Sequence, residues 1–122
     1  MTQLILVFLG GGMGSLCRYG MARWLLNHST QFPLATLLAN VVSCLILGYL
    51  TELTLRESIT VNYRLLWMTG FCGGFSTFST FTGETLLLMQ QGQHFTALLN
   101  IGISVLVCLC CFYLGMIAVK VL

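Results

Sequence analysis

Four long apolar segments occupy almost the whole chain, at about residues 4–26, 33–51, 65–90 and 96–119. A helix of about 20 apolar residues is long enough to cross the hydrocarbon core of a bilayer. Of the residues, 57% are hydrophobic and 7% are charged, and the mean hydropathy is +0.95, which excludes a soluble globular domain. We therefore predict an all-α membrane protein with four transmembrane helices, forming a single transmembrane domain over residues 1–122.

The third apolar segment carries an unusual polar stretch near its middle, at residues 70–84. Glycines at 70, 73, 74 and 83 weaken a helix there, and the Ser and Thr side chains offer the backbone competing hydrogen bonds. Non-helical backbone at membrane depth is tolerated only where it is buried in protein or lines a wet cavity. The stretch therefore predicts a break in the third helix near the bilayer midplane, and such a break is typical of a functional site.

Helical spacing places two sets of polar side chains, each on one face of its helix. The second helix carries Thr36, Asn40 and Ser43, and the fourth carries Thr96, Asn100, Ser104 and Cys108. Together with the break, these faces predict a pathway with almost no fixed charge, in which a solute meets hydroxyls, amides and ring edges. An Asn in hydrocarbon needs hydrogen bonds, so Asn40 either joins two helices or belongs to this hydrated pathway.

Charged residues and cysteines narrow the possible functions. Arg18 lies inside the first segment, where a guanidinium either marks the membrane interface or lines a vestibule that raises the local anion concentration. The six cysteines lie inside apolar segments, and their spacing favours neither disulfides nor a zinc site. We see no arrangement typical of nucleophilic or acid-base catalysis, and we do not expect an enzyme.

The small size of the chain predicts self-association. Four helices leave little room for an internal pore, so we expect a homo-oligomer whose pathway runs at or near a subunit boundary. With four spans, Arg56, Arg64 and Lys120 share one side of the membrane, while Arg18 and Arg23 lie toward the other. This difference in positive charge between the two sides is small. It permits insertion in both orientations, and hence an antiparallel homodimer of dual topology.

Three motifs follow one another along the chain. They are Gly-Gly-x-x-Gly-x-x-x-Arg-Tyr at residues 10–19, Pro33-x-x-Thr36-x-x-x-Asn40 with Gly48, and Gly-Phe-Cys-Gly-Gly-Phe-Ser-Thr-Phe-Ser-Thr-Phe at residues 70–81 with Glu84. In these motifs the whole chain resembles the Fluc/CrcB family of fluoride channels. The resemblance implies a dual-topology homodimer with two antiparallel fluoride pores, each lined by both subunits, and a sodium ion at its centre.

The resemblance also implies roles for individual residues. Phe78 and Phe81 supply phenyl groups whose electropositive edges face the anion. The backbone carbonyls of Gly73 and Ser76 from each subunit bind the sodium ion, and oxygen ligands suit this hard cation. The rest of the implied fluoride pathway consists of Asn40 near the phenyl groups, Arg18 at the aqueous vestibule, and Ser104, Thr82 and Glu84 on its polar side.

Two positions depart from the pattern of this family. The break commonly carries two threonines, whereas this chain has Ser76 and Thr77, a change that keeps the carbonyl and one hydroxyl. Some members carry a tyrosine at the position of Asn100. We therefore expect the break to be preserved and the polar track along the fourth helix to differ.

These expectations describe passive export of fluoride from a microbial cytoplasm by a multi-pass protein of the bacterial inner membrane. The expected partners are fluoride, sodium, the lipid bilayer and a second copy of the chain, and not nucleic acid. Two other functions stay open. A proton-coupled carrier needs a membrane-embedded acid, for which Glu84 is the one candidate in the spans. The other is that of a non-transport subunit, which would pack into a larger complex through its glycine-rich faces.

Overall fold

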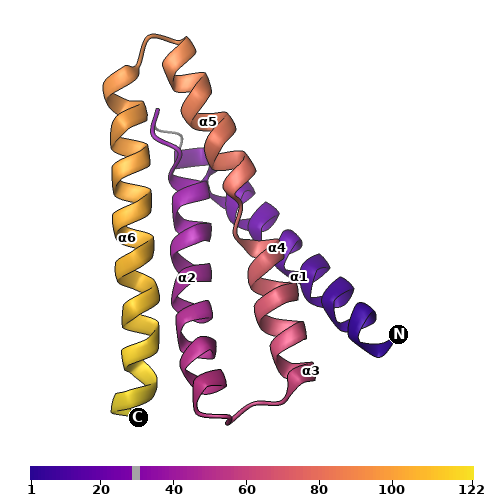
Figure 1. Cartoon of the computed structure of the whole chain (residues 1–122). Helices are drawn as coiled ribbons and strands as arrows, with labels where there is room; N and C mark the ends of the chain where they lie inside the picture. The colour runs from indigo at the N-terminus through magenta and orange to yellow at the C-terminus, as the bar shows by residue number, and fades with distance from the viewer. Residues whose placement is uncertain (29–30) are drawn as a thin grey trace.

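The computed structural model describes residues 1–28 and 31–122, which are helical apart from short connections (Figure 1). The helices are α1 (Thr2–Leu25) with a 3-10 turn (Leu26–His28), α2 (Leu34–Leu55), α3 (Val61–Arg64), a π-helix (Leu65–Cys72), α4 (Gly73–Phe75), α5 (Phe78–Gln90) and α6 (His94–Val121). The described residues contain no strand, so the prediction of an all-α protein is confirmed. Part of the predicted connection before Pro33, residues 29 and 30, lies outside the described residues.

Three helices are long and apolar enough to cross a membrane, namely Thr2–His28, Leu34–Leu55 and His94–Val121. They coincide with the predicted segments 4–26, 33–51 and 96–119. The first and last extend beyond both predicted bounds, and the second starts one residue later and ends four residues later than predicted. The predicted segment 65–90 lies in two helical parts. Residues 61–75 form one continuous helical rod, and α5 begins after two extended residues, Ser76 and Thr77.

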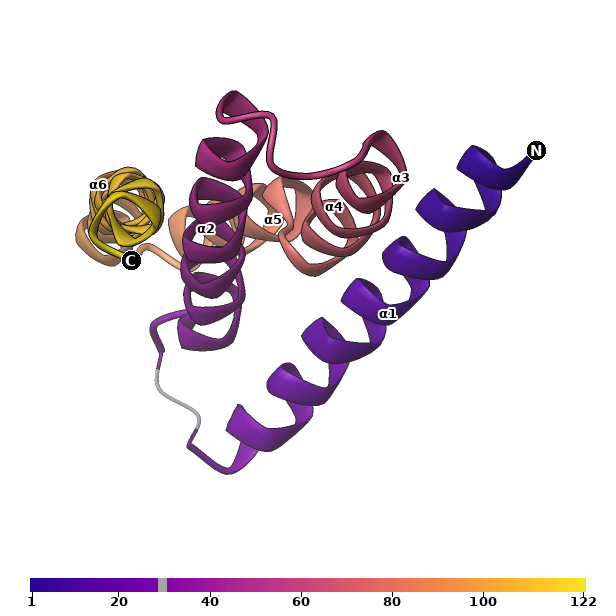
Figure 2. The same ribbon diagram turned by 90° about the horizontal axis from the view of Figure 1, so that it is seen from below.

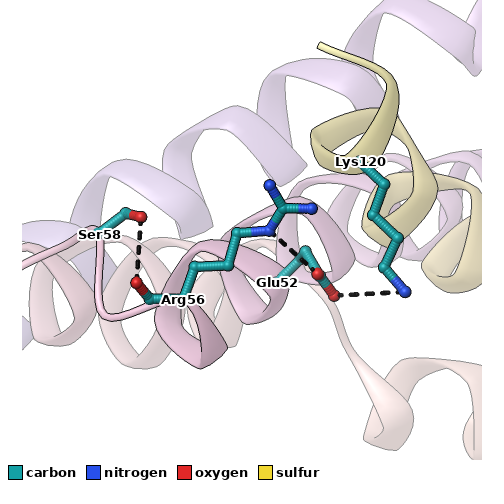
Figure 3. A network of polar contacts seen from close by, with 4 residues as sticks. All are labelled: Glu52, Arg56, Ser58 and Lys120. Carbon is teal, nitrogen blue, oxygen red and sulfur yellow. Dashed lines mark hydrogen bonds and ion pairs between the residues drawn. The ribbon is translucent and has the colours of Figure 1, made fainter.

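The second helix is longer than predicted, and the added residues include a buried acid, Glu52. The predicted segment 33–51 ends before Glu52, but α2 continues to Leu55. Glu52 is buried, and its carboxylate lies 3.2 Å from Arg56 Nε and 3.9 Å from Lys120 Nζ (Figure 3). A buried carboxylate is costly unless it is paired. These two cations therefore allow the helix to continue through an acidic residue and tie its end to α6.

Helices α2 and α6 lie side by side in a tightly packed seam (Figure 1). Gly48 of α2 contacts the backbone of Phe112, and Gly115 of α6 contacts the backbone of Leu45. A side chain at either glycine would collide with the backbone of the other helix. The two glycines therefore fix the separation of α2 and α6 at backbone contact.

Helix α1 runs obliquely to the other helices (Figure 2) and packs against the rod formed by residues 61–75. Gly10 contacts the backbones of Leu66 and Phe71, and Gly14 contacts those of Phe71 and Phe75. The spacing Gly10-x-x-x-Gly14 is typical of such a close approach between helices. Because α1 supports this rod, the end of the rod at Phe75 is held in place from one side by α1 and from the other by α2.

Candidate functional site

The rod ends where the backbones of Ser76 and Thr77 become extended. Ser76 has φ −75° and ψ 156°, and Thr77 has φ −152° and ψ 113°. The Cys72 carbonyl accepts hydrogen bonds from the Ser76 N–H (3.0 Å), the Ser76 hydroxyl (2.8 Å) and the Ser43 hydroxyl of α2 (3.1 Å). Side-chain hydroxyls thus stabilise the point at which the chain leaves the helix and tie it to α2.

Thr77 starts the next helix as its N-cap. Its hydroxyl oxygen accepts a hydrogen bond from the Thr80 N–H at 3.2 Å and donates to the Thr80 hydroxyl at 3.0 Å. A capping threonine satisfies one of the N–H groups that the first turn of a helix leaves unpaired. The sequence Ser-Thr-Phe therefore both ends one helix and begins another within two residues.

Asn40 of α2 binds the backbone of Thr77 at two points. The Thr77 N–H donates to Asn40 Oδ1 at 2.8 Å, and Asn40 Nδ2 donates to the Thr77 carbonyl at 3.3 Å. Asn40 was predicted either to join two helices or to belong to the hydrated pathway. In the structure it joins α2 to the extended backbone at Thr77. A carboxamide nitrogen carries two N–H groups, so one remains for another acceptor.

A pocket of about 240 Å³ lies on one side of the break, and we call it the aromatic pocket. Its polar and aromatic lining consists of Asn40, Ser76, Thr77, Ser104, Phe78 and Phe81, and Cys44, Val105 and Cys108 complete it. The ring centroids of Phe78 and Phe81 are 5.6 Å apart, and the rings are tilted by 39°. Phe78 is 79% exposed in the single chain, so its ring is available to another surface.

A second pocket of about 260 Å³, the charged pocket, is lined by residues of α1, α2 and α5 together with Thr77. Its polar lining consists of Ser15, Arg18, Tyr19, Thr36, Thr77, Thr80 and Glu84. The Thr36 hydroxyl donates to Glu84 Oε1 at 2.8 Å, whereas Glu84 Oε2 is buried without a partner among the described residues. Because Thr77 lines both pockets, they meet at the helix break.

The structure brings most of the predicted pathway residues to these two pockets. Asn40, Phe78, Phe81 and Ser104 line the aromatic pocket, and Arg18 and Glu84 line the charged pocket. Thr82 lines neither of them, because it is exposed and its hydroxyl donates to the Phe78 carbonyl at 2.9 Å. Of the two predicted sodium ligands, Ser76 lies at the break and Gly73 is exposed at the start of α4.

Two threonines to which the sequence assigned no individual role also line the charged pocket, Thr36 and Thr80. Thr36 was predicted to share a helix face with Asn40, and that shared face is confirmed by their hydrogen bonds to Glu84 and Thr77. The signal for Thr80 is its position three residues after the N-cap, which directs its hydroxyl back to Thr77. Spacing relative to the cap would have favoured Thr80 over Thr82.

The polar side chains of α6 make hydrogen bonds mainly inside the bundle. Asn100 is 1% exposed, and its Nδ2 donates to the Thr85 hydroxyl of α5 at 2.9 Å. The Ser104 hydroxyl in turn donates to Asn100 Oδ1 at 3.3 Å. Asn100 therefore orients the hydroxyl of Ser104, which lines the aromatic pocket.

The fold and the two pockets together define a class of protein. Three apolar helices are of membrane-spanning length, and polar groups from α1, α2, α5 and α6 line the two pockets beside Thr77. Among the described residues, no group of three or more His, Cys, Asp or Glu side chains could hold a metal ion. These features are those of a small all-helical membrane protein of the channel or transporter class.

Comparison with known proteins identifies the family. The family model described as CrcB-like protein, Camphor Resistance (CrcB), matches residues 5–116, and the chain belongs to this family, which confirms the resemblance of its motifs. The fluoride-specific ion channel FluC of Pyrococcus abyssi is 41% identical over 98% of this chain and 96% of its own length. The protein of the same name from Geobacter metallireducens is 38% identical over 98% of both chains. The family is one of ion channels and not of enzymes.

Proposed function

We propose that the chain forms a fluoride-specific channel through which fluoride leaves the cell passively. The observation that carries this proposal is that the aromatic and charged pockets lie next to each other at Thr77, so that polar groups flank the break on both sides. Its full-length relatives named as fluoride-specific ion channels support the same function. The lowering of cytoplasmic fluoride follows from passive flow down the gradient.

The two pockets suit the hydration chemistry of fluoride. A small, strongly hydrated anion crosses a membrane only if donors replace its water without binding it too tightly to leave. In the aromatic pocket these donors are the spare N–H of Asn40, the Ser104 hydroxyl and the ring edges of Phe78 and Phe81. In the charged pocket Arg18 attracts the anion, and Glu84 keeps the net charge low.

The interrupted helix serves in this proposal as the fourth membrane crossing. Residues 61–75 and α5 are each shorter than the roughly 20 residues that a span needs, but together they cover residues 61–90. The break then lies near the bilayer midplane, and residues 1–122 form a single transmembrane domain. Figure 1 supports this arrangement, since the N-terminus, the C-terminus and the α2–α3 connection lie in its lower half and the α5–α6 turn at its top.

The functional unit in this proposal is an antiparallel homodimer of dual topology. Phe78 is 79% exposed beside the aromatic pocket, which is expected for a side chain that lines a pathway together with a second copy of the chain. A mass measurement on the purified complex should give two chains per particle. Crosslinks near Phe78 between two chains inserted in opposite orientations would support the antiparallel pairing. Crosslinks formed only between chains of the same orientation would contradict it.

A sodium ion at the centre of the dimer would bind to the carbonyls of Gly73 and Ser76 from each subunit. In a continuous helix the Gly73 carbonyl would accept the Thr77 N–H, but that N–H donates to Asn40. The hydrogen bond of Asn40 thus leaves the Gly73 carbonyl without its usual helical donor. Neutral backbone oxygens suit a hard cation, so the residues at the break fit sodium.

We place the protein in the inner membrane of a bacterial cell, where the proposed activity can be tested by growth. A strain that lacks its own fluoride export should grow in fluoride when it produces this chain. It should fail to grow when it produces equal amounts of Asn40→Ala. Failure of the wild-type chain to restore growth, while it is present in the membrane, would contradict fluoride export.

A further inference from the structure

The seam between α2 and α6 brings two thiols together. Gly48 and Gly115 hold the two helices at backbone contact. Cys44 lies one helical turn before Gly48, and Cys108 lies one turn before Phe112, the residue that Gly48 touches. The thiols of Cys44 and Cys108 are neighbours across this seam and line the same pocket. Rigid helix packing, and not a flexible loop, therefore sets their separation.

Both thiols are accessible from the aromatic pocket. Cys44 and Cys108 are half-buried and line that pocket beside Phe81 and Ser104. Cys111, also on α6, interacts electrostatically with both thiols but does not line the pocket. The exposed thiols of Cys17 and Cys110 do not line it either. The pocket thus offers a pair of thiols to any ion that enters it.

The number of available ligands determines which kind of metal ion the two thiols could bind. The described residues offer no third His, Cys, Asp or Glu to such a site, which excludes the four-ligand geometry of zinc. Two thiolates without further ligands suit a soft ion of low coordination number. Charge favours a divalent ion, because two thiolates neutralise it and a neutral complex is less costly to hold in an apolar pocket.

We propose that Cys44 and Cys108 form a two-coordinate site for a soft divalent cation, with Hg²⁺ as its probe, inside the aromatic pocket. Each thiol loses its proton to water as its sulfur binds the metal, so one Hg²⁺ replaces two protons per chain. The bound ion lies beside Phe81 and Ser104 and occupies the space between α2 and α6 in this pocket. On the proposed function, on which this part rests, the occupied site blocks fluoride.

Binding is tested first, on the purified full chain in detergent and without any transport assay. With one equivalent of Hg²⁺ per chain, the intact mass should rise by one mercury minus two protons. Cys44 and Cys108 should then be protected from alkylation by N-ethylmaleimide. Cys44→Ser and Cys108→Ser should each lose the bound mercury, whereas Cys17→Ser and Cys110→Ser should keep it. Protection that is unchanged in Cys44→Ser and Cys108→Ser would overturn the site.

Transport is tested second, as fluoride efflux from liposomes normalised to the mercury-free rate of each variant. Micromolar Hg²⁺ should block the wild type, and an excess of a dithiol should restore efflux. Half-block of Cys44→Ser or Cys108→Ser should need about 100-fold more Hg²⁺, since a serine oxygen is a poor ligand for a soft ion. Full efflux with mercury bound at both thiols would overturn the block. An absence of efflux without mercury contradicts the proposed function instead and leaves the binding result to decide on the site.

Discussion

The two pockets that meet at Thr77 are of similar size but opposite chemistry. The charged pocket has Arg18 and Glu84 in its lining, and the aromatic pocket has no ionic side chain at all. The residue that joins them is held by Asn40 through both of its backbone polar groups. In the proposed channel, one pocket would concentrate the anion by charge, and the other would select it with neutral donors and ring edges.

The same comparison explains why the break has an extended backbone. A continuous helix would satisfy its own N–H and carbonyl groups and present only side chains to both pockets. Two extended residues instead require partners from outside the helix, which α2 supplies with Asn40 and Ser43. One polar helix face therefore stabilises the break and lines the proposed path.

The largest effect is expected from Asn40→Ala, which removes the support of the junction between the pockets. It leaves the Thr77 N–H and carbonyl without their partners, at a cost of about 1–3 kcal/mol for each buried group. Fluoride efflux from liposomes should fall by about 100-fold, equivalent to about 2.7 kcal/mol at the barrier. Thr51→Ala is the control on the same helix, because the Thr51 hydroxyl donates to the Leu47 carbonyl and does not touch Thr77 or either pocket. Equal losses of efflux in both variants would contradict a special role of the junction.

Replacement of the aromatic rings tests the neutral pocket. Phe78→Ile and Phe81→Ile keep apolar bulk but remove the electropositive ring edges, so each should lower fluoride efflux by at least about tenfold. Phe71→Ile and Phe95→Ile are controls, since neither residue lines the aromatic pocket. Efflux measured with a fluoride electrode should change little in the controls. Equal loss at all four sites would mean general disruption of packing.

Glu84→Gln tests whether the charged pocket does more than concentrate the anion. The amide oxygen can still accept the Thr36 hydroxyl that now donates at 2.8 Å, so the geometry should persist. For a passive channel we expect efflux to change by less than about tenfold and to stay independent of a proton gradient. Efflux measured with and without an imposed pH gradient decides this. Loss of transport in Glu84→Gln, together with proton-driven transport by the wild type, would instead favour a carrier that uses Glu84 as its coupling acid.

The smallest effect is expected from Arg18→Gln. Loss of this charge should lower fluoride efflux by about two- to threefold at low ionic strength, and the difference should vanish in high salt, where charges are screened. Arg23→Gln is the matched control, since Arg23 is outside the charged pocket and contacts Tyr19. Efflux measured at two salt concentrations gives the comparison. A salt-independent loss would assign Arg18 a packing role.

Several features of this site could be predicted from the sequence because they depend on local chemistry. Glycines and hydroxyls at residues 70–84 predicted an interruption, and helical spacing put Thr36 and Asn40 on one face. Other features depend on contacts between distant residues. The second ion pair of Glu52 needs Lys120, and the approach of Cys44 to Cys108 needs Gly48 and Gly115. No local pattern contains that information.

The π-helix at Leu65–Cys72 was also not predicted. A π-helix forms from the same residue types as an α-helix and occurs as short stretches within one, so the composition of the segment gives little signal for it. Here it precedes the break directly and packs on Gly10 of α1 through Leu66 and Phe71. Tertiary packing, which the sequence pattern does not specify, therefore decides this part of the site.

The most direct measurement is anion release from liposomes that contain only this purified chain, followed with fluoride and chloride electrodes in parallel and with sodium present. Fast fluoride release with negligible chloride release is the predicted result. It would establish that copies of this one chain suffice for a fluoride-selective path. Release of both anions at similar rates, or of neither from folded protein, would contradict the account.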